Sequence, residues 1–295
     1  MRLADPARDP RGDDARGEGV PAEVGSIAAL DEQRWNERLL AAPLAVPGVR
    51  TWRYREPAVV LGRAQRALAA SLRRDRADDA GGALPLVERL AGGGAVLVGP
   101  WMIGLSVALP HAHRLVAGRS IAASYDWLGE VFVDLLAARG VDARVATAAD
   151  ARKAAAPLAW ACFAGVTAGE VLVDGRKLVG FAQRRNRHGV LLVAGMLLDA
   201  VPWAALCAAV VGDRTAAERL RCAAALAETT IDLATARDRR RVASGDAVVG
   251  PRRDAEAGST PERGNDVAAE LAHAVGCCVD PPSPASPAPG APVYA

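Results

Sequence analysis

The hydrophobic positions of this chain follow a helical period in some segments and a strand period in others. Apolar side chains recur at helical spacing over residues 120–139, and Gly140 comes directly afterwards. This pattern predicts an amphipathic helix that ends at the glycine. A similar pattern over residues 26–40 predicts an earlier helix, with Ser26 as its N-cap.

Shorter apolar runs predict strands. Residues 49–54 and 58–61 are such runs, and a Glu-Pro pair separates them, which favours extended backbone at the break. The run over residues 189–212 is about long enough to cross a membrane, but Asp199 near its middle costs roughly 2.5 to 3.5 kcal/mol in a bilayer. Because Pro202 suits the first turn of a helix, we interpret this run as a buried strand followed by a helix.

The most informative stretch covers residues 170–183. Asp174 and Gly175 predict a tight type I′ hairpin, since both central residues of that turn need positive φ. After the turn, side chains of a strand alternate between the two faces of the sheet. One face receives Lys177, Val179, Phe181 and Gln183, and the other receives Leu178, Gly180 and Ala182. Both faces are largely apolar, and burying an unpaired ammonium costs several kcal/mol. Lys177 therefore either has a buried partner or extends to solvent beside the turn.

The order of these elements predicts an α+β fold. Strands and helices alternate irregularly with hairpins among them, which favours a mixed β-sheet flanked by helices over a doubly wound sheet. The chain ends are rich in Pro, Gly, Ala and charged residues. We expect a disordered N-terminus over residues 1–24, a globular body over 25–236, a charged flexible loop over 237–264, a short helix over 265–278 and a disordered tail over 279–295.

Composition narrows the functional classes. The chain has 295 residues, a net charge of +2 and 24% charged residues, so no global field argues for a nucleic acid or an anionic membrane as partner. Its beginning is polar and lacks an apolar signal segment, and its five cysteines lack metal-ligand or disulfide-framework spacing. We expect a cytoplasmic protein. His111 and His113 have no acidic or cysteine neighbour in their motif, so we assign no metal ligand.

A second stretch that carries chemistry is a run of three glycines. Gly92, Gly93 and Gly94 follow Arg89 and enter a strand at Ala95. Such a backbone turns sharply, approaches a ligand closely and offers N–H groups to a carboxylate or phosphate. The run is neither a Walker P-loop nor a Rossmann fingerprint. Taken by itself it is equally typical of a flexible turn.

In their order along the chain, several motifs match one known pattern. They are Ala29-Leu30-Asp31-Glu32, the segment from Trp52 to Gln65, Arg89 with the glycine run and Ala95-Val96, Gly175 to Gln183, His188 to Leu192, and Asp199. Together they resemble the catalytic domain of the lipoate-protein ligase A and octanoyltransferase family, which is related to biotin-protein ligases. The resemblance implies a biotin/lipoate protein ligase-like, class II aminoacyl-tRNA synthetase-like catalytic domain over the globular body.

The resemblance also implies an activity and a site. Members attach lipoate or octanoate to a lysine of the lipoyl domains of 2-oxoacid dehydrogenases or of the glycine cleavage H protein. Lys177 matches the catalytic lysine, which holds the acyl carbonyl or the adenylate phosphate. Arg89 is expected at the pocket mouth and His188 beside the pocket, although a lone histidine here is more often structural. The remaining implied acyl- and nucleotide-binding positions are Gly92, Gly93, Gly94, Ala95, Gly180, Ala182 and Gly189.

Two chemistries occur in this family. Ligases activate free lipoate or octanoate with ATP and Mg²⁺ through an acyl-adenylate, whereas transferases take octanoate from acyl carrier protein through a cysteine thioester and need no cofactor. Cys162 lies fifteen residues before Lys177 and matches the nucleophilic cysteine of one octanoyltransferase branch. A nearby ammonium would favour its thiolate. The alternative for Cys162 is a small buried hydrophobic residue.

Some positions depart from the family pattern. Leu97 and Val98 stand where many ligases have a His-Asp pair, and Phe181 stands where a serine is usual. The phenyl ring is expected to narrow the acyl pocket, and Gly94 favours the ligase pattern. We therefore expect an ATP-dependent lipoate-protein ligase, in which Lys177 holds the reacting acyl group. The alternatives are a Cys162-dependent octanoyltransferase and a non-catalytic protein that binds an acyl group or a lipoyl domain.

Overall fold

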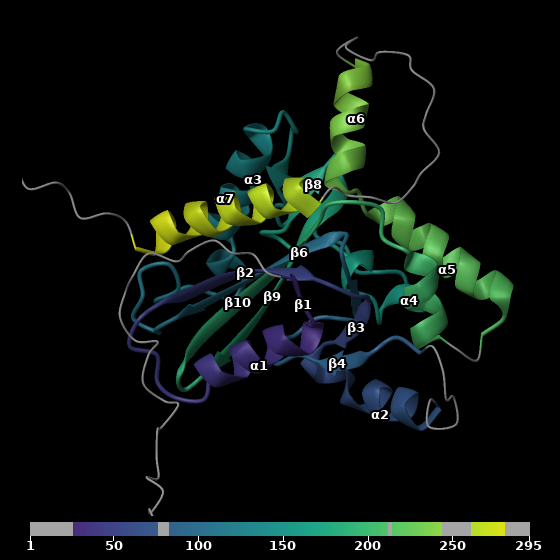
Figure 1. Cartoon of the computed structure of the whole chain (residues 1–295), viewed down its shortest axis with the longest axis horizontal. Helices are drawn as coiled ribbons and strands as arrows, with labels where there is room; N and C mark the ends of the chain where they lie inside the picture. Colours follow the sequence, from purple (N-terminus) through teal and green to yellow (C-terminus); the bar gives the residue numbers. More distant parts are fainter. Residues whose placement is uncertain (1–25, 76–82, 212–213, 244–260, 281–295) are drawn as a thin grey trace, which may run out of the picture.

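The computed structural model describes residues 26–75, 83–211, 214–243 and 261–280. A mixed sheet of seven strands has the order β1-β2-β6-β10-β9-β8-β7, and a smaller sheet has the order β4-β3-β5 (Figure 1). The strands are β1 (Ser26–Ile27), β2 (Gly48–Tyr54), β3 (Ala58–Leu61), β4 (Leu86–Glu88), β5 (Val96–Val98), β6 (Met102–Leu109), β7 (Arg144–Val145), β8 (Val171–Val173), β9 (Arg176–Asn186) and β10 (Gly189–Leu197). The expectation of an α+β fold is confirmed.

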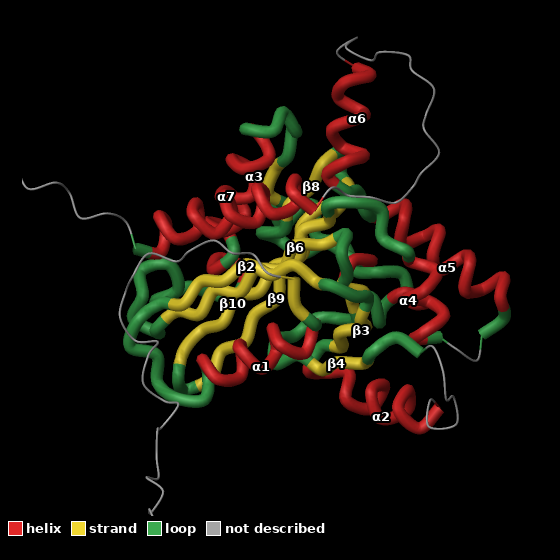
Figure 2. Tube along the Cα trace, viewed as in Figure 1, coloured by secondary structure: helices red, strands yellow, loops and turns green. Residues whose placement is uncertain are grey.

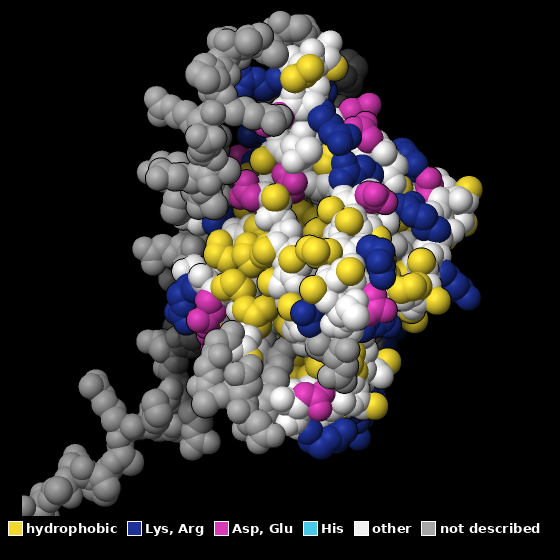
Figure 3. Space-filling view, turned by 90° about the vertical axis from the view of Figure 1, so that its right-hand side faces the viewer, with side chains coloured by type: hydrophobic (Ala, Val, Ile, Leu, Met, Phe, Trp, Pro, Cys, Tyr) yellow, Lys and Arg dark blue, Asp and Glu magenta, His cyan; other side chains and the backbone are white. Residues whose placement is uncertain are grey.

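Helices cover both faces of the large sheet (Figure 2). The α-helices are α1 (Ala29–Leu39), α2 (Arg66–Asp75), α3 (Asp126–Ala137), α4 (Trp203–Val210), α5 (Ala216–Thr229), α6 (Leu233–Ala243) and α7 (Pro261–Val279). Helices α3 and α7 lie on one face, while α1 and the small sheet lie on the other (Figure 1). Figure 3 shows the side formed by α4 and α5, where hydrophobic side chains gather near the middle and Lys and Arg side chains lie around them.

The two largest hydrophobic cores of the described residues follow from this arrangement. The first lies under α3 and α7 and includes Phe132 and Leu271. The second lies between the opposite face of the large sheet, the small sheet and helices α4 and α5, and it includes Trp52, Leu97 and Leu206. Because strand side chains alternate between faces, the large sheet supplies residues to both cores. The candidate site described below opens in the second core.

The helix predicted over residues 120–139 is present as the 3-10 turn η2 (Ala122–Ser124) and α3. Gly140 follows α3 with φ of +73° and ends it. The start of the first helix was predicted wrongly, because Ser26 is not its N-cap. Ser26 pairs with Arg53 in a parallel bridge between β1 and β2, and α1 begins at Ala29. This contact between distant segments cannot be read from local periodicity.

The apolar run over residues 189–212 contains β10 and then α4, with Pro202 at the N-cap, so the strand-then-helix interpretation is confirmed. Nowhere in the described part of the chain is a helix both long enough and apolar enough to cross a membrane.

The structure differs from the charged loop predicted over residues 237–264. Residues 237–243 form the second half of α6 and are all exposed, whereas Leu233 and Ala236 in its first half are buried. Residues 244–260 of the predicted loop lie outside the described residues. The helix predicted over 265–278 is longer at both ends, as α7. The predicted disorder over residues 1–24 and beyond residue 280 falls outside the described residues.

Candidate active site

The site begins at the hairpin between β8 and β9. Asp174 and Gly175 have φ of 51° and 71°, as the predicted type I′ turn requires. Pairing is regular next to the turn, where Leu172 faces Lys177, but Val171 then faces Val179. Leu178 of β9 therefore has no paired residue on β8 and forms a β-bulge. A bulge at this place changes the face to which the side chains before and after it point.

The bulge brings Lys177 to the same side of the sheet as Gly180. A Cβ atom placed on Gly180 would lie 2.9 Å from Lys177 Cε and 3.3 Å from Phe163 Cζ, so the lysine stem crosses directly over the glycine. Strict alternation had put Lys177 with Val179 and Phe181, and that prediction is wrong. The side-chain period of a strand shifts by one residue at a bulge.

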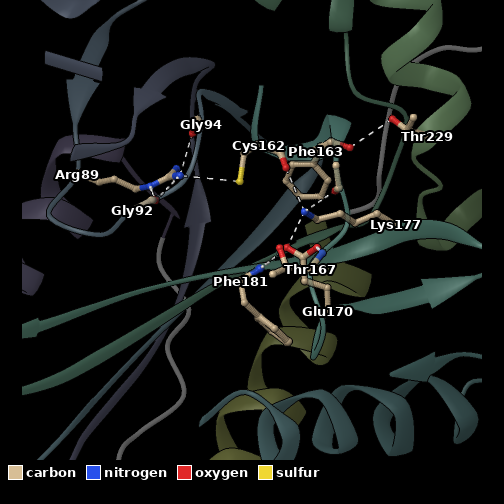
Figure 4. Close-up of polar contacts among 11 residues, drawn as sticks. Arg89, Gly92, Gly94, Cys162, Phe163, Thr167, Glu170, Lys177, Phe181 and Thr229 are labelled. Atoms are coloured by element: carbon tan, nitrogen blue, oxygen red, sulfur yellow. Dashed lines mark hydrogen bonds and ion pairs between the residues drawn. The ribbon is translucent and has the colours of Figure 1, made fainter. Parts of the chain in front are cut away.

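The ring of Phe181 points away from the lysine (Figure 4). It stacks on Tyr125 with ring centroids 5.3 Å apart, and its centroid lies 5.8 Å from that of Phe132 on α3. The ring therefore belongs to the core beneath α3. Phe181 nevertheless lines the cleft described below, so the expectation that it narrows the acyl pocket stays a prediction.

Lys177 is a buried cation with a buried partner. Its side chain is 2% exposed, and its Nζ lies 2.6 Å from Oε1 of Glu170, whose side chain is also 2% exposed. Nζ also donates hydrogen bonds to the carbonyl oxygens of Cys162 (3.1 Å) and Gly165 (3.3 Å). Of the two sequence alternatives, the lysine with a buried partner is the one observed. Lys177 therefore ties β9 to the segment that carries Cys162.

Glu170 is the functional residue that the sequence analysis missed. Its Oε2 accepts a hydrogen bond from the backbone N–H of Thr167 (2.8 Å), and its Oε1 accepts one from Phe181 (3.3 Å). A signal was present, because Glu170 stands in the same hairpin stretch and a buried ammonium requires a nearby carboxylate. Figure 4 shows how it anchors Lys177 from below while Cys162 lies above.

Arg89 holds the glycine run in shape. Its Nε and Nη2 donate to the carbonyl oxygen of Gly92 (3.0 and 2.9 Å), and Nη2 also donates to Gly94 (2.8 Å). Gly93, between them, has φ of +91°, a conformation that favours glycine. The glycine run is therefore a fixed loop around a buried guanidinium, and the flexible-turn alternative does not hold.

The glycine run and the cysteine segment are joined by backbone hydrogen bonds. The N–H of Ala95 donates to the carbonyl oxygen of Trp160 (2.7 Å), and the N–H of Cys162 donates to that of Ala95 (2.8 Å). A Cβ atom on Gly94 would lie 2.5 Å from the Trp160 oxygen, so only glycine permits this approach. As a result, the Sγ of Cys162 lies 3.9 Å from Nη2 of Arg89 (Figure 4).

Cys162 opens onto a cleft in the second core. The cleft encloses about 470 Å³ of empty space, part of it open to solvent. Its lining is mostly apolar with a few polar groups, as is typical of small-molecule sites. The lining residues are Glu32, Gln33, Tyr54, Val60, Arg89, Val96, Val98, Met102, Cys162, Phe163, Gly180, Phe181, Ala182, Val193, Ala194 and Gly195. The structure thus brings together Arg89, Cys162, Gly180 and Ala182, with Lys177 directly behind them.

Two expected site residues lie elsewhere. His188 and Gly189 are at the turn between β9 and β10 and do not line the cleft. The Nδ1 of His188 is hydrogen-bonded to the carbonyl oxygen of Leu40 (2.8 Å), and Gly189 packs against Leu44. His188 is therefore a structural histidine that fastens the hairpin to the end of α1.

One end of the cleft is closed by a buried acid. The Tyr54 hydroxyl donates a hydrogen bond to Oε2 of Glu32 (2.8 Å). Burial raises the pKa of Glu32, and burial together with the adjacent Glu32 charge raises the pKa of Tyr54 well above its usual range. Cys207 shows the same effect on a thiol, since burial in the core raises its pKa to about 11. Cys162 is half-buried, and its Sγ lies 3.9 Å from Nη2 of Arg89.

Comparison with known proteins gives a consistent result. Residues 28–232 match the model of the family described as "Lipoyl protein ligase A/B catalytic domain". Over 118 residues the chain is 36% identical to octanoyltransferase LipM of Kyrpidia tusciae, an alignment that covers 39% of this chain and 42% of that protein.

Two solved structures are also similar. One is lipoate-protein ligase A bound with ATP (17% identity, TM-score 0.44, 78% of this chain and 72% of the other). The other is a bipartite lipoate protein ligase from Thermoplasma acidophilum (18% identity, TM-score 0.47, 81% and 84%).

Proposed function

The chain belongs to the lipoyl protein ligase A/B catalytic domain family, and we propose that within this family it is a cysteine-dependent octanoyltransferase. It takes an octanoyl group from an acyl carrier thioester and transfers it to a lysine of a lipoyl domain. The observation that carries the proposal is the position of Cys162. Its half-buried sulfur lines the cleft and lies 3.9 Å from the Arg89 guanidinium.

The surroundings of Lys177 support a cysteine nucleophile as well. In a ligase, the matching lysine would hold the acyl carbonyl or the adenylate phosphate. Here its ammonium is already bonded to Glu170 and to the carbonyl oxygens of Cys162 and Gly165. A cation engaged in this way is suited to fixing the nucleophile segment in place. The curated relative at 36% identity also bears the name of an octanoyltransferase.

The proposed reaction has two steps that exchange acyl bonds without any change of oxidation state. First, the sulfur of Cys162 attacks the carbonyl carbon of the donor thioester, and the carrier thiol leaves with the proton. Second, the amine of the acceptor lysine attacks the same carbon, so that a C–N bond forms and the bond to sulfur breaks. The proton lost by the amine passes to the Cys162 sulfur, which restores the free thiol.

Arg89 is the group placed to stabilise charge in both steps. Negative charge develops on the attacking or leaving sulfur and on the carbonyl oxygen, and a fixed guanidinium beside them lowers the barrier. Because Arg89 is held by Gly92 and Gly94, its position needs no rearrangement during the reaction. Lys177 acts through Cys162 as a positioning residue.

The ATP-dependent ligase expected from the sequence fits the cleft less well. Mg²⁺ bound with nucleotide phosphates uses carboxylate and other oxygen ligands. Among the described residues that line the cleft, the acidic one is Glu32, whose Oε2 already accepts the Tyr54 hydroxyl. Burial also raises the pKa of Glu32 and so disfavours its charged form. These residues do not fit Mg-ATP, and we derive no step through it.

The test is intact-mass analysis of the protein and an apo lipoyl domain, incubated with octanoyl acyl carrier protein and without ATP. We expect the lipoyl domain to gain one octanoyl group, and the protein itself to carry one before the acceptor is added. Cys162→Ala should abolish both signals. Cys277→Ala is the matched control, because this cysteine lies exposed on α7 and should not affect either signal.

Two other outcomes would contradict the octanoyltransferase proposal and favour a different function. Octanoylation only with free octanoate and Mg-ATP, unaffected by Cys162→Ala, would establish the ligase chemistry instead. Binding of octanoate or of the lipoyl domain without any mass gain would favour the non-catalytic alternative.

A further inference from the structure

The floor of the cleft contains a row of glycines that crosses three strands. Gly180 on β9 pairs with Gly195 on β10, and Gly195 pairs with Gly104 on β6. Residues paired across adjacent strands point to the same face of a sheet. Three neighbouring positions without side chains therefore form a shallow trough, perpendicular to the strands, that begins beneath Lys177 and the Cys162 segment.

A different side chain lies over each glycine. Lys177 covers Gly180, as described above. A Cβ atom on Gly195 would lie 3.1 Å from Sδ of Met102, and one on Gly104 would lie 2.3 Å from the Tyr54 hydroxyl oxygen. Met102 is therefore in the middle of the trough, and Tyr54 closes its far end.

The trough has the length of a medium acyl chain. Adjacent strands are about 4.8 Å apart, so two spacings give ~10 Å from β9 to β6. An extended alkyl chain advances roughly 1.25 Å per carbon–carbon bond, given bonds of about 1.5 Å and angles near 111°. The row therefore accommodates a chain of about eight carbons before it meets Tyr54.

The two side chains over the far part of the trough differ in mobility. Tyr54 is fixed, because its hydroxyl donates to the buried Glu32. Met102 is unbranched and has three rotatable bonds, so its thioether can move aside and pack along an alkyl chain. Its side chain is 2% exposed and it lines the cleft.

We propose that Met102 is the residue that determines the length of acyl chain this site accepts, with the Tyr54–Glu32 pair as a fixed stop. This inference rests on the proposed function, in which the acyl group is carried on Cys162. The chain lies along the glycine row up to Tyr54, and the Met102 side chain fills the space over the middle of the row into which a longer chain would otherwise bend.

The experiment compares Met102→Ala with Met196→Ala. Met196 is a matched control, because it is also fully buried in the large sheet but belongs to the opposite core under α3 and α7. Octanoyl, decanoyl and dodecanoyl carrier thioesters compete for the protein, and intact mass records which acyl group it carries. We expect Met102→Ala to raise the dodecanoyl-to-octanoyl ratio by at least about tenfold, since added room in an apolar pocket changes selectivity on that scale. Met196→Ala should leave the ratio unchanged.

A second variant tests the opposite direction. Gly195→Ala places a methyl group in the trough and should shift the preference toward a hexanoyl donor, which is added to the competing thioesters for this variant. An unchanged ratio in both Met102→Ala and Gly195→Ala, or an equal change in Met196→Ala, would overturn the assignment.

A readout independent of covalent chemistry separates this inference from the proposed function. The rise in Tm on adding free octanoate or dodecanoate reports binding alone. If Met102→Ala reverses the order of the two acids while Cys162 never gains mass, the trough assignment stands and the transferase assignment fails. If Cys162 is acylated but neither readout changes with Met102→Ala, the trough assignment fails.

Discussion

At the scale of single residues, the decisive feature is the buried pair of Lys177 and Glu170. Removing two charges from water costs several kcal/mol each, and the attraction between them offsets this only when their remaining hydrogen bonds are satisfied. That condition is met, because two backbone carbonyls accept from Lys177 and two backbone N–H groups donate to Glu170. The pair therefore organises the backbone around Cys162 more than it stabilises the fold.

Because the two charges are paired, we expect the effects of mutating Lys177 and Glu170 on the free energy of unfolding to be strongly non-additive. Glu170→Gln leaves the ammonium without a counter-charge and should lower the free energy of unfolding by about 3–5 kcal/mol. Lys177→Met should cost a similar amount, while the double variant should recover most of the loss because no unpaired charge remains. Chemical denaturation of the wild type, the two single variants and the double variant measures the coupling between the two side chains as a double-mutant cycle. Additive losses in the double variant would contradict a direct ion pair.

For single residues, the sequence analysis predicted which residues belong to the site better than it predicted their contacts. Asp174 and Gly175 were predicted correctly, since their turn depends on two adjacent residues alone. Arg89 and Cys162 were expected at the site and both line the cleft. The partnership of Lys177 with Glu170 was missed, because the sequence left open whether Lys177 is buried or extends to solvent beside the turn. His188 was expected beside the pocket, but its partner, the carbonyl oxygen of Leu40, is 148 residues away in sequence.

At the scale of elements, the bulge in β9 sets the geometry of the site. Without it, Lys177 would point with Val179 and Phe181 into the core beneath α3. With one extra residue at Leu178, the lysine turns to the cleft side and crosses Gly180. A sequence pattern of period two cannot show such a shift, because the bulge is defined by the register with β8.

Gly180→Ala tests this geometry. The new methyl group would lie 2.9 Å from Lys177 Cε and should push the ammonium away from Glu170 and from the Cys162 carbonyl. We expect a loss of about 1–3 kcal/mol in unfolding free energy, as for other overpacked cores, and at least a tenfold loss of acyl transfer (~1.4 kcal/mol in the barrier). Denaturation and the acylation assay measure the two effects.

The control for this substitution is Gly276→Ala in α7, where an added Cβ meets no atom within 4 Å. It should keep full activity and gain up to about 1 kcal/mol from improved helix propensity. Equal behaviour of the two alanine variants would show that Lys177 does not depend on the space above Gly180.

At the scale of the whole molecule, α7 completes a core that the family-matched segment supplies only in part. The family match ends at residue 232, whereas α7 lies beyond it and packs on β2, β6 and α3. Its Val267, Leu271 and Val275 are buried in the first core. Periodicity predicted a helix here, but only the structure shows which face of the sheet it covers.

Leu271→Ala should therefore destabilise the entire domain. A fully buried leucine replaced by alanine costs about 2–5 kcal/mol through lost transfer energy and the cavity left behind. Thermal denaturation should show one lowered transition, since α7 shares its core with the large sheet. His273→Ala, on the exposed side of the same helix, is the control and should leave Tm nearly unchanged. A normal Tm for Leu271→Ala would mean that α7 docks without supporting the sheet.

The backbone link between Ala95 and the cysteine segment has a consequence for the order of folding. Arg89 and Cys162 are 73 residues apart in sequence, and closing so long a loop carries an entropic cost before any contact compensates for it. We expect the local β8–β9 hairpin to form before the guanidinium and the sulfur are aligned, since that alignment requires the small sheet to dock. In the proposed transferase, a newly made chain would thus carry the Cys162 thiol before the Arg89 guanidinium is aligned with it.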